Sequence, residues 1–293
     1  SGNVTADAIG TIAIGYESLK SLTNGIGNVA IGYQAMATED TGDYSTVVGY
    51  QALQNQNYDG DAGNTMLGYR TGNALTDGIR NVFIGRSAGS ATTGGNFNIG
   101  IGYAALNAGL TGDAAGTIGI GYAAGNALTT AAANVAIGHQ AMQVHTTGGG
   151  NIAIGYQAMD DTDAGSNSKN SQYNVFIGYS AGGGTWTNAE CNFNVGIGAF
   201  TLDAALAGAL DNTTVGYAGL TSLTSGGSNT TVGHRAGERI TTGNKNTIVG
   251  AEAGSFVTDA DENTIVGTEA GYDLTGTESV LIGSRAGYNL AAV

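Results

Sequence analysis

The chain has 293 residues, with 52 glycines, no proline and a formal net charge of −14. Average usage would supply about 20 glycines and about 15 prolines, and the missing prolines together with the lack of a Gly-X-Y period exclude collagen. The hydrophobic content of 41% excludes a disordered chain, and the acidic balance argues against nucleic-acid binding, which needs a basic face.

Two further classes are excluded by composition. No run of about 18 apolar residues occurs, so we expect no membrane insertion. The single cysteine, Cys191, rules out an intrachain disulfide and any cysteine-based metal cage.

An internal repeat covers almost the whole chain. Sixteen short motifs end in glycine, with spacings that are most often 17 and range from 16 to 23. Ile, Val or Thr stands three residues before each glycine, and Ile, Val or Leu stands one residue before it, an alternation that predicts a β-strand. The glycines are Gly15, Gly32, Gly49, Gly68, Gly85, Gly102, Gly121, Gly138, Gly155, Gly178, Gly198, Gly216, Gly233, Gly250, Gly267 and Gly283.

The other positions of the repeat define the coil. The middle strand position is never charged, so both faces of the strand are apolar or small, as in parallel sheets. Four residues before the glycine, twelve repeats carry Asn, which can bond backbone or form a ladder between stacked coils. Tyr follows the glycine in nine repeats, and a polar turn closes the coil.

Seventeen residues are too few for a strand, a full helix and two loops. The sequence therefore predicts an all-β fold, a parallel β-solenoid of about sixteen coils that forms a single repeat domain over residues 1–293. If the middle strand position faced water, a long apolar stripe would be exposed. We expect it to be buried in a tight core or between symmetric copies, which favours a homotrimer.

The repeats resemble those of known fibrous proteins. The sequences of residues 28–36, Asn-Val-Ala-Ile-Gly-Tyr-Gln-Ala-Met, and 151–159, Asn-Ile-Ala-Ile-Gly-Tyr-Gln-Ala-Met, resemble the head repeats of trimeric autotransporter adhesins, and still more the repeats of bacteriophage tail fibres. The resemblance spans about 270 residues in sixteen tandem matches. It implies a trimeric, left-handed β-roll displayed outside a cell or on a virion.

Two catalytic patterns are explained by the repeat itself. Residues 85–89 and 178–182 match the G-x-S-x-G motif, but the same slot in other repeats holds Glu or Arg, so we expect no catalytic serine. His139 and His234 occupy the Tyr position, where we expect a planar ring in a surface stack. We therefore expect no enzyme.

One acidic loop resembles a calcium site. Asp59, Asp61 and Asn64 place oxygens at nearly alternate positions, as calcium loops do, and residues 160–163 and 259–263 are similar. None has the full twelve-residue pattern. Calcium is therefore the candidate cofactor, and a solvated acidic turn is the alternative.

The period breaks at two insertions, residues 160–173 and 183–193. They contain Tyr173, the only tryptophan, Trp186, and Phe193. Aromatic side chains among Asn, Asp and Thr suit sugar rings, so these three are the candidate glycan contacts. The alternative is that Trp186 and Phe193 pin the insertion to the solenoid.

These features favour a structural and adhesive protein, the shaft or head of an extracellular or virion fibre. We expect it to bind a cell-surface receptor or glycan through repeated weak sites that gain avidity in a trimer. The alternatives are a virion polysaccharide depolymerase, which would need a converging carboxylate pair, and a self-assembling filament subunit.

Overall fold

The computed structural model describes residues 8–162, 170–187 and 189–290. The chain divides into two compact units, Ser1–Thr147 and Gly148–Val293. The described residues form an all-β parallel β-solenoid of about 15 coils with a period near 17 and no helix, which confirms the predicted fold class. None of the described residues forms a helix that could cross a membrane.

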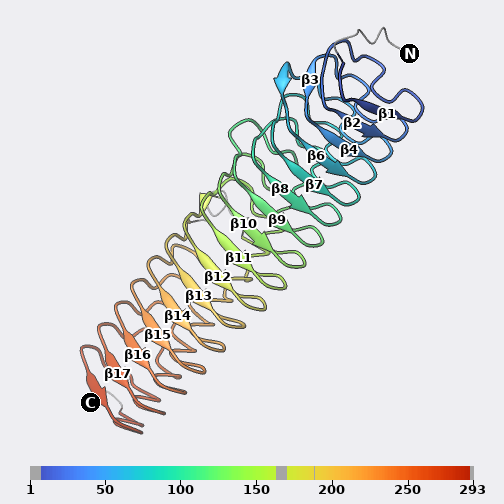
Figure 1. Ribbon diagram of the computed structural model, residues 1–293. Helices are drawn as coiled ribbons and strands as arrows, with labels where there is room; N and C mark the ends of the chain where they lie inside the picture. The colour runs from blue at the N-terminus through green and yellow to red at the C-terminus, as the bar shows by residue number, and fades with distance from the viewer. Residues whose placement is uncertain (1–7, 163–169, 188, 291–293) are drawn as a thin grey trace. The chain divides into compact units, whose positions relative to one another are not determined.

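Each coil of the first unit contributes one three-residue strand, and the strands pair in parallel in chain order (Figure 1). A second, two-stranded sheet joins β3 (Gly42–Asp43) to β5 (Gly60–Asp61). The main strands are β1 (Ile12–Ile14), β2 (Val29–Ile31), β4 (Thr46–Val48), β6 (Thr65–Leu67), β7 (Val82–Ile84), β8 (Ile99–Ile101), β9 (Ile118–Ile120) and β10 (Val135–Ile137).

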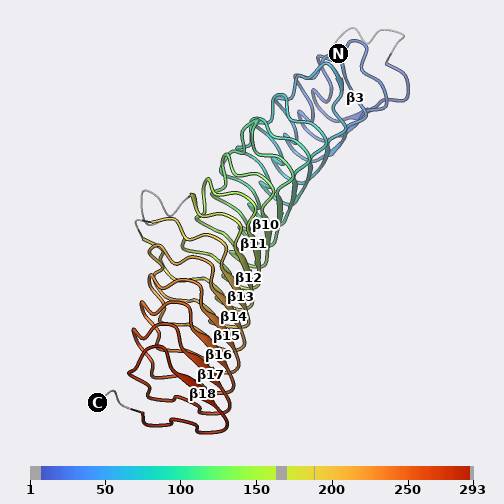
Figure 2. The same cartoon turned by 90° about the vertical axis from the view of Figure 1, so that its left-hand side faces the viewer.

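The second unit repeats this arrangement. Its strands lie along one side of the coils, and the return segments lie on the other side (Figure 2). The register pairs equivalent residues of successive repeats, for example Thr230 with Thr247. The strands are β11 (Ile152–Ile154), β12 (Val175–Ile177), β13 (Val195–Ile197), β14 (Thr213–Val215), β15 (Thr230–Val232), β16 (Thr247–Val249), β17 (Thr264–Val266) and β18 (Val280–Ile282).

The repeat glycine follows each of these strands and stacks directly on the glycine of the next coil. Its φ lies between +124° and +150°, a region that side-chain-bearing residues rarely adopt. A Cβ on Gly198 would lie 1.7 Å from the carbonyl oxygen of Gly216, and one on Gly233 would lie 2.4 Å from that of Gly250. We call this stack the glycine column. Both the dihedral and the close approach require glycine.

The asparagines form the predicted ladder inside the coils. In eleven of these asparagines, Oδ1 accepts a hydrogen bond from the backbone N–H at the equivalent position of the next coil, over 2.8–3.1 Å. In most of these coils Nδ2 donates to a backbone carbonyl in the turn of the next coil, as Asn229 does to Gly243 at 2.7 Å. These side chains are buried, so the ladder satisfies polar groups that would otherwise lose water without compensation.

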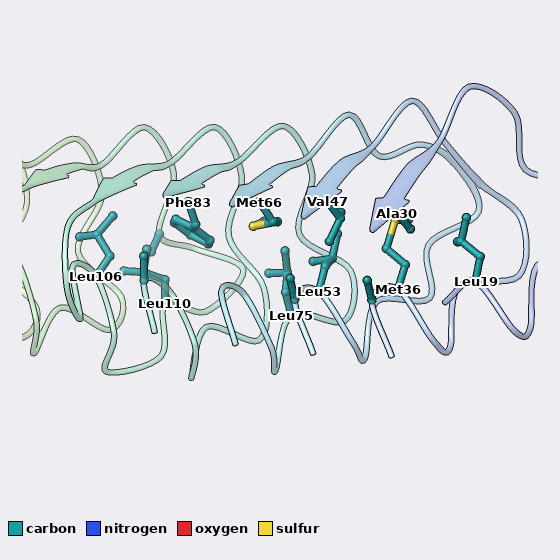
Figure 3. Close-up of a cluster of buried hydrophobic side chains, with 14 of the residues drawn as sticks. Leu19, Ala30, Met36, Val47, Leu53, Met66, Leu75, Phe83, Leu106 and Leu110 are labelled. Carbon is teal, nitrogen blue, oxygen red and sulfur yellow. The ribbon is translucent and has the colours of Figure 1, made fainter. Parts of the chain in front are cut away.

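The middle strand position lies in the core. Ala30, Val47, Met66 and Phe83 point from their strands toward the return segments and meet side chains such as Leu53 there (Figure 3). Of the two places expected to bury this position, the structure shows the tight core. The residues on either side of it face outward, so they form the apolar stripe.

Side-chain volume is balanced across most coils. Where the middle strand position is small, the position four residues after the glycine is usually Leu or Met, as in Ala30 with Met36. The exception is Gly119, which stands across from Gly125, and there Leu106 of the preceding coil lies against both glycines.

Where the middle strand position is large, the position four residues after the glycine is Gly: a Cβ on Gly89 would lie 2.4 Å from the ring of Phe83. Close packing explains the alternation of Leu or Met with Gly at this position.

We predict that Gly233→Ala destabilises the protein much more than Gly283→Ala. Both variants incur the backbone strain of positive φ, about 1–3 kcal/mol. Only the new methyl group at position 233 would also collide with the next coil, since the nearest atom to a Cβ on Gly283 is 4.0 Å away. We expect this overpacking to add about 1–3 kcal/mol.

The measurement is the urea-unfolding midpoint followed by circular dichroism. Gly112→Ala is the control, because Gly112 has no positive φ and no neighbour within 4 Å of a Cβ. Equal midpoints for the Gly233→Ala and Gly283→Ala variants would contradict a role for the close backbone approach.

Candidate functional site: the exposed aromatic column

The tyrosines that follow the repeat glycines form a stack on the surface, here called the aromatic column. In the first unit, Tyr16, Tyr33, Tyr50 and Tyr69 stack with ring centroids 5.0–5.4 Å apart and interplanar angles of 8–16°. All four rings are exposed. A continuous ribbon of ring edges and phenol groups therefore faces solvent.

The backbone sets the spacing of these rings. The N–H of the residue after each tyrosine donates to the carbonyl of the tyrosine in the preceding coil, as Gln34 does to Tyr16 and Gln51 does to Tyr33, both at 2.8 Å. The stack therefore inherits the spacing of the coils, and each ring is presented in the same orientation.

The two column histidines behave as predicted. His139 stacks on Tyr122 at 4.8 Å and 12°, and His234 stacks on Tyr217 at 5.3 Å and 10°. The serines of the two G-x-S-x-G matches, Ser87 and Ser180, occupy the turn position that Gln34 holds in its own coil, with the same positive φ. The repeat geometry accounts for both motifs.

An amide ladder borders the aromatic column in the first unit. Gln34 Nε2 donates to Glu17 Oε2 at 2.7 Å, and its Oε1 accepts from Gln51 Nε2 at 3.0 Å and from Gln54 Nε2 at 3.1 Å. The bond from Gln34, followed by that from Lys20, lowers the pKa of Glu17. Aromatic edges beside amide donors and acceptors can contact both the apolar and the hydroxyl surfaces of a sugar.

The column continues in the second unit with one change. Tyr156 and Tyr179 stack at 5.1 Å and 5°. In the next coil Ala199 takes the tyrosine position, and Phe200 fills the gap edge-on, 5.2 Å from Tyr179 and 5.8 Å from Tyr217. An alanine at this position is thus compatible with the coil.

The three predicted glycan contacts do not come together. Tyr173 and Phe193 are 57% and 54% exposed and stack at 5.6 Å and 8°. Trp186 is buried: its ring packs edge-on against Phe176 at 5.8 Å, and its Nε1 donates to the Gly182 carbonyl at 3.1 Å.

This placement corrects the expectation for Trp186. A ring enclosed by protein cannot stack on a sugar, so Trp186 holds the insertion, as the alternative stated. Residues 163–169 and 188 of the two insertions lie outside the described residues.

The candidate calcium ligands also make other contacts in the structure. Asn64 is buried in the asparagine ladder, where Nδ2 donates to Gly78 and Oδ1 accepts from the N–H of Asn81. Asp61 is exposed and pairs with Arg80 at 3.2 Å, and Asp59 accepts from the Thr41 hydroxyl. Within residues 8–162, 170–187 and 189–290, no group of three or more His, Cys, Asp or Glu is arranged to hold a metal ion.

Two carboxylates that sequence reasoning did not pair lie on either side of Gly183 in the second unit. Oδ1 of Asp160 and Oδ1 of Asp203 both lie 3.1 Å from the point that a Cβ of Gly183 would occupy. Burial, reinforced by Asp161, raises the pKa of Asp160 to about 6. Burial, reinforced by Asp160, raises the pKa of Asp203 to about 6. A carboxylate pair is the feature that the depolymerase alternative would need.

Comparison with known proteins adds no relative to this picture. No family model, no curated protein and no solved structure matches the chain.

We predict that the protein becomes more stable as the pH falls from about 7 to about 4. The folded state holds protons on Asp160 and Asp203 in this range that the unfolded state, with its ordinary aspartate pKa of 3.8, has released. The free energy of unfolding therefore decreases as the pH rises toward 6.

Asp203→Asn should raise the stability near neutral pH by about 1–2 kcal/mol, allowing for solvent screening of partly exposed groups, and flatten the pH profile. Melting temperatures at several pH values test this. Asp113→Asn, at an exposed site in the first unit, is the control. If the Asp203→Asn variant has the same pH profile of stability as the wild type, Asp203 and Asp160 do not cause the pH dependence.

Proposed function

We propose that this protein is a structural and adhesive component of an extracellular or virion fibre, which binds surface glycans through its aromatic column. The observation that carries the proposal is the register of Tyr16, Tyr33, Tyr50 and Tyr69 beside the amide ladder. Identical groups recur at each coil, so a polysaccharide can engage several weak sites at once and gain avidity. Such a site needs no deep pocket.

The proposal includes a homotrimer. The outward positions of the strands are Ile, Val, Leu or Thr in every coil, and several remain exposed, such as Leu67, Ile197 and Val232. A continuous apolar face of this kind on a parallel sheet is stabilised when another copy covers it. Three copies around a common axis would bury this face and leave the tyrosines at the surface. The resemblance of the repeats to trimeric adhesins and tail fibres supports the same stoichiometry.

We expect light scattering to give three times the 29.1 kDa chain mass. Val232→Lys would place a charge in the apolar face and shift the mass toward that of one chain, while circular dichroism remains that of a β-protein. Ser228→Lys is the matched control in the same coil, since Lys245 naturally occupies the equivalent exposed position of the next coil. A wild-type mass of 29.1 kDa would refute the trimer.

The glycan proposal is tested by replacing Tyr33 and Tyr50 with alanine. Ala199 shows that the position accepts alanine, so the fold should persist. We expect each lost ring to weaken a glycan contact by about 1 kcal/mol, and multivalency to amplify the loss. Binding to a glycan array and to whole cells is the measurement.

A variant with alanine at Tyr173 and Phe193 serves as the comparison. Loss of binding in that variant alone would transfer the function to the insertion. If both variants bind as the wild type does, the adhesive proposal fails.

A further inference from the structure

The first unit contains a groove of about 380 Å³ at one point of the aromatic column. It is lined by one aromatic ring, two guanidinium groups and short polar side chains. The lining residues are Tyr69, Arg70, Asn73, Arg86, Ser87 and Ser90. No acidic residue lines the groove, although the chain as a whole carries a net charge of −14.

Arg86 occupies the tyrosine position of its coil. Its guanidinium carbon lies 5.7 Å from the ring centroid of Tyr69 and 5.6 Å from that of Tyr103, so it replaces one ring of the stack. Cation–π contacts on both sides hold the planar group in the stack, where Arg86 lines the groove. A guanidinium group held in this orientation is preorganised to bind an anionic group.

Arg70 lies in the adjacent coil, at the position that Gln51 occupies one coil earlier. The described residues form five ion pairs, which involve the cations Lys20, Arg80, Arg235, Lys245 and Arg285. Arg70 and Arg86 belong to none of these pairs. Two like charges that share one groove repel each other, and a bound anion would remove that repulsion.

The polar neighbours of the arginines are ordered by the coils. Asn73 Nδ2 donates to the Gln51 carbonyl at 2.9 Å and to Gln54 Oε1 at 3.1 Å. Ser90 donates to Asn107 Oδ1. The amide ladder thus leads directly into the groove, so a saccharide that follows the column would meet the two arginines.

We infer that this groove binds the anionic group of an acidic saccharide, a carboxylate or a sulfate, with Arg70 and Arg86 as its partners. The inference deepens the proposed function and rests on it, because it names the class of glycan that the aromatic column would select. The net negative charge of the rest of the chain would repel acidic glycans elsewhere on the surface and favour binding with the anionic group in this groove.

The test uses substitutions to residues that the repeat itself provides. Arg70→Gln introduces the residue of the preceding coil, and Arg86→Tyr restores the uninterrupted stack, so the double variant should fold normally. The full chain is titrated with oligogalacturonate, its neutral methyl ester and dextran sulfate, at low and at physiological salt. The control variant is Arg235→Gln, which removes a cation at the position equivalent to Arg70 in the second unit.

We expect the wild type to bind at least one of the two anionic probes more tightly than the methyl ester. The double variant should lose about tenfold or more in that affinity and much of its salt dependence. Arg235→Gln should retain both. Preference for oligogalacturonate alone would assign a carboxylate, and preference for dextran sulfate alone would assign a sulfate.

The outcomes separate the two proposals. The groove proposal is overturned if the double variant and the wild type bind the anionic probes with equal affinity. It is also overturned if the wild type binds the methyl ester as tightly as it binds both anionic probes. Unchanged ester binding in the Tyr33 and Tyr50 variant, with lost anion binding in the double variant, would overturn the aromatic column and support the groove. A wild type that binds none of the three probes overturns the groove, whatever the glycan array shows.

Discussion

The backbone contact along the glycine column fixes the distance between coils, and the other ladders follow from it. With a Cβ on Gly198 only 1.7 Å from the Gly216 carbonyl oxygen, no side chain fits between successive turns. The same short repeat brings each Asn amide within hydrogen-bonding distance of the next coil and sets the tyrosine rings about one coil apart. The core, the polar ladder and the surface column therefore share one register, and a displacement at the glycine column would disturb all three.

Much of the fold could be predicted because sixteen repeats carry similar residue types at equivalent positions. The strand positions, the asparagine ladder and the stacking of His139 and His234 all follow from columns of equivalent residues. The direction in which the strand faces could not be predicted, since its inner and outer positions are both apolar or small. Only volume separates them: the middle position varies from Gly to Phe, in most coils with a compensating residue across the coil, which is a property of packing.

The candidate site was less accessible to sequence reasoning, for a physical reason. Singular residues such as Trp186 drew attention as ligand contacts, but a large apolar ring in an insertion is stabilised most by burial. The more informative departures from the repeat were the two arginines of the groove. Arg86 replaces a tyrosine in an otherwise regular column and Arg70 replaces a glutamine, so both positions carried a signal in the alignment of repeats. The pairing of Asp160 with Asp203 depends on the intervening Gly183, which no single repeat reveals.

The volume balance within each coil has a consequence for how a chain of near-identical repeats finds its register. If all coils were alike, a segment could pair one coil out of step at little cost, and such slipped states would compete with the native one. Phe83 needs Gly89 in its own coil and Gly100 in the next, where an added Cβ would lie 2.8 Å from its ring. Phe176 stands in the same relation to Gly182 and Gly196. A slip by one coil would set Phe176 against Thr214 in place of Gly196, where its ring would have less room. The uneven core therefore favours the native register at such a coil during folding.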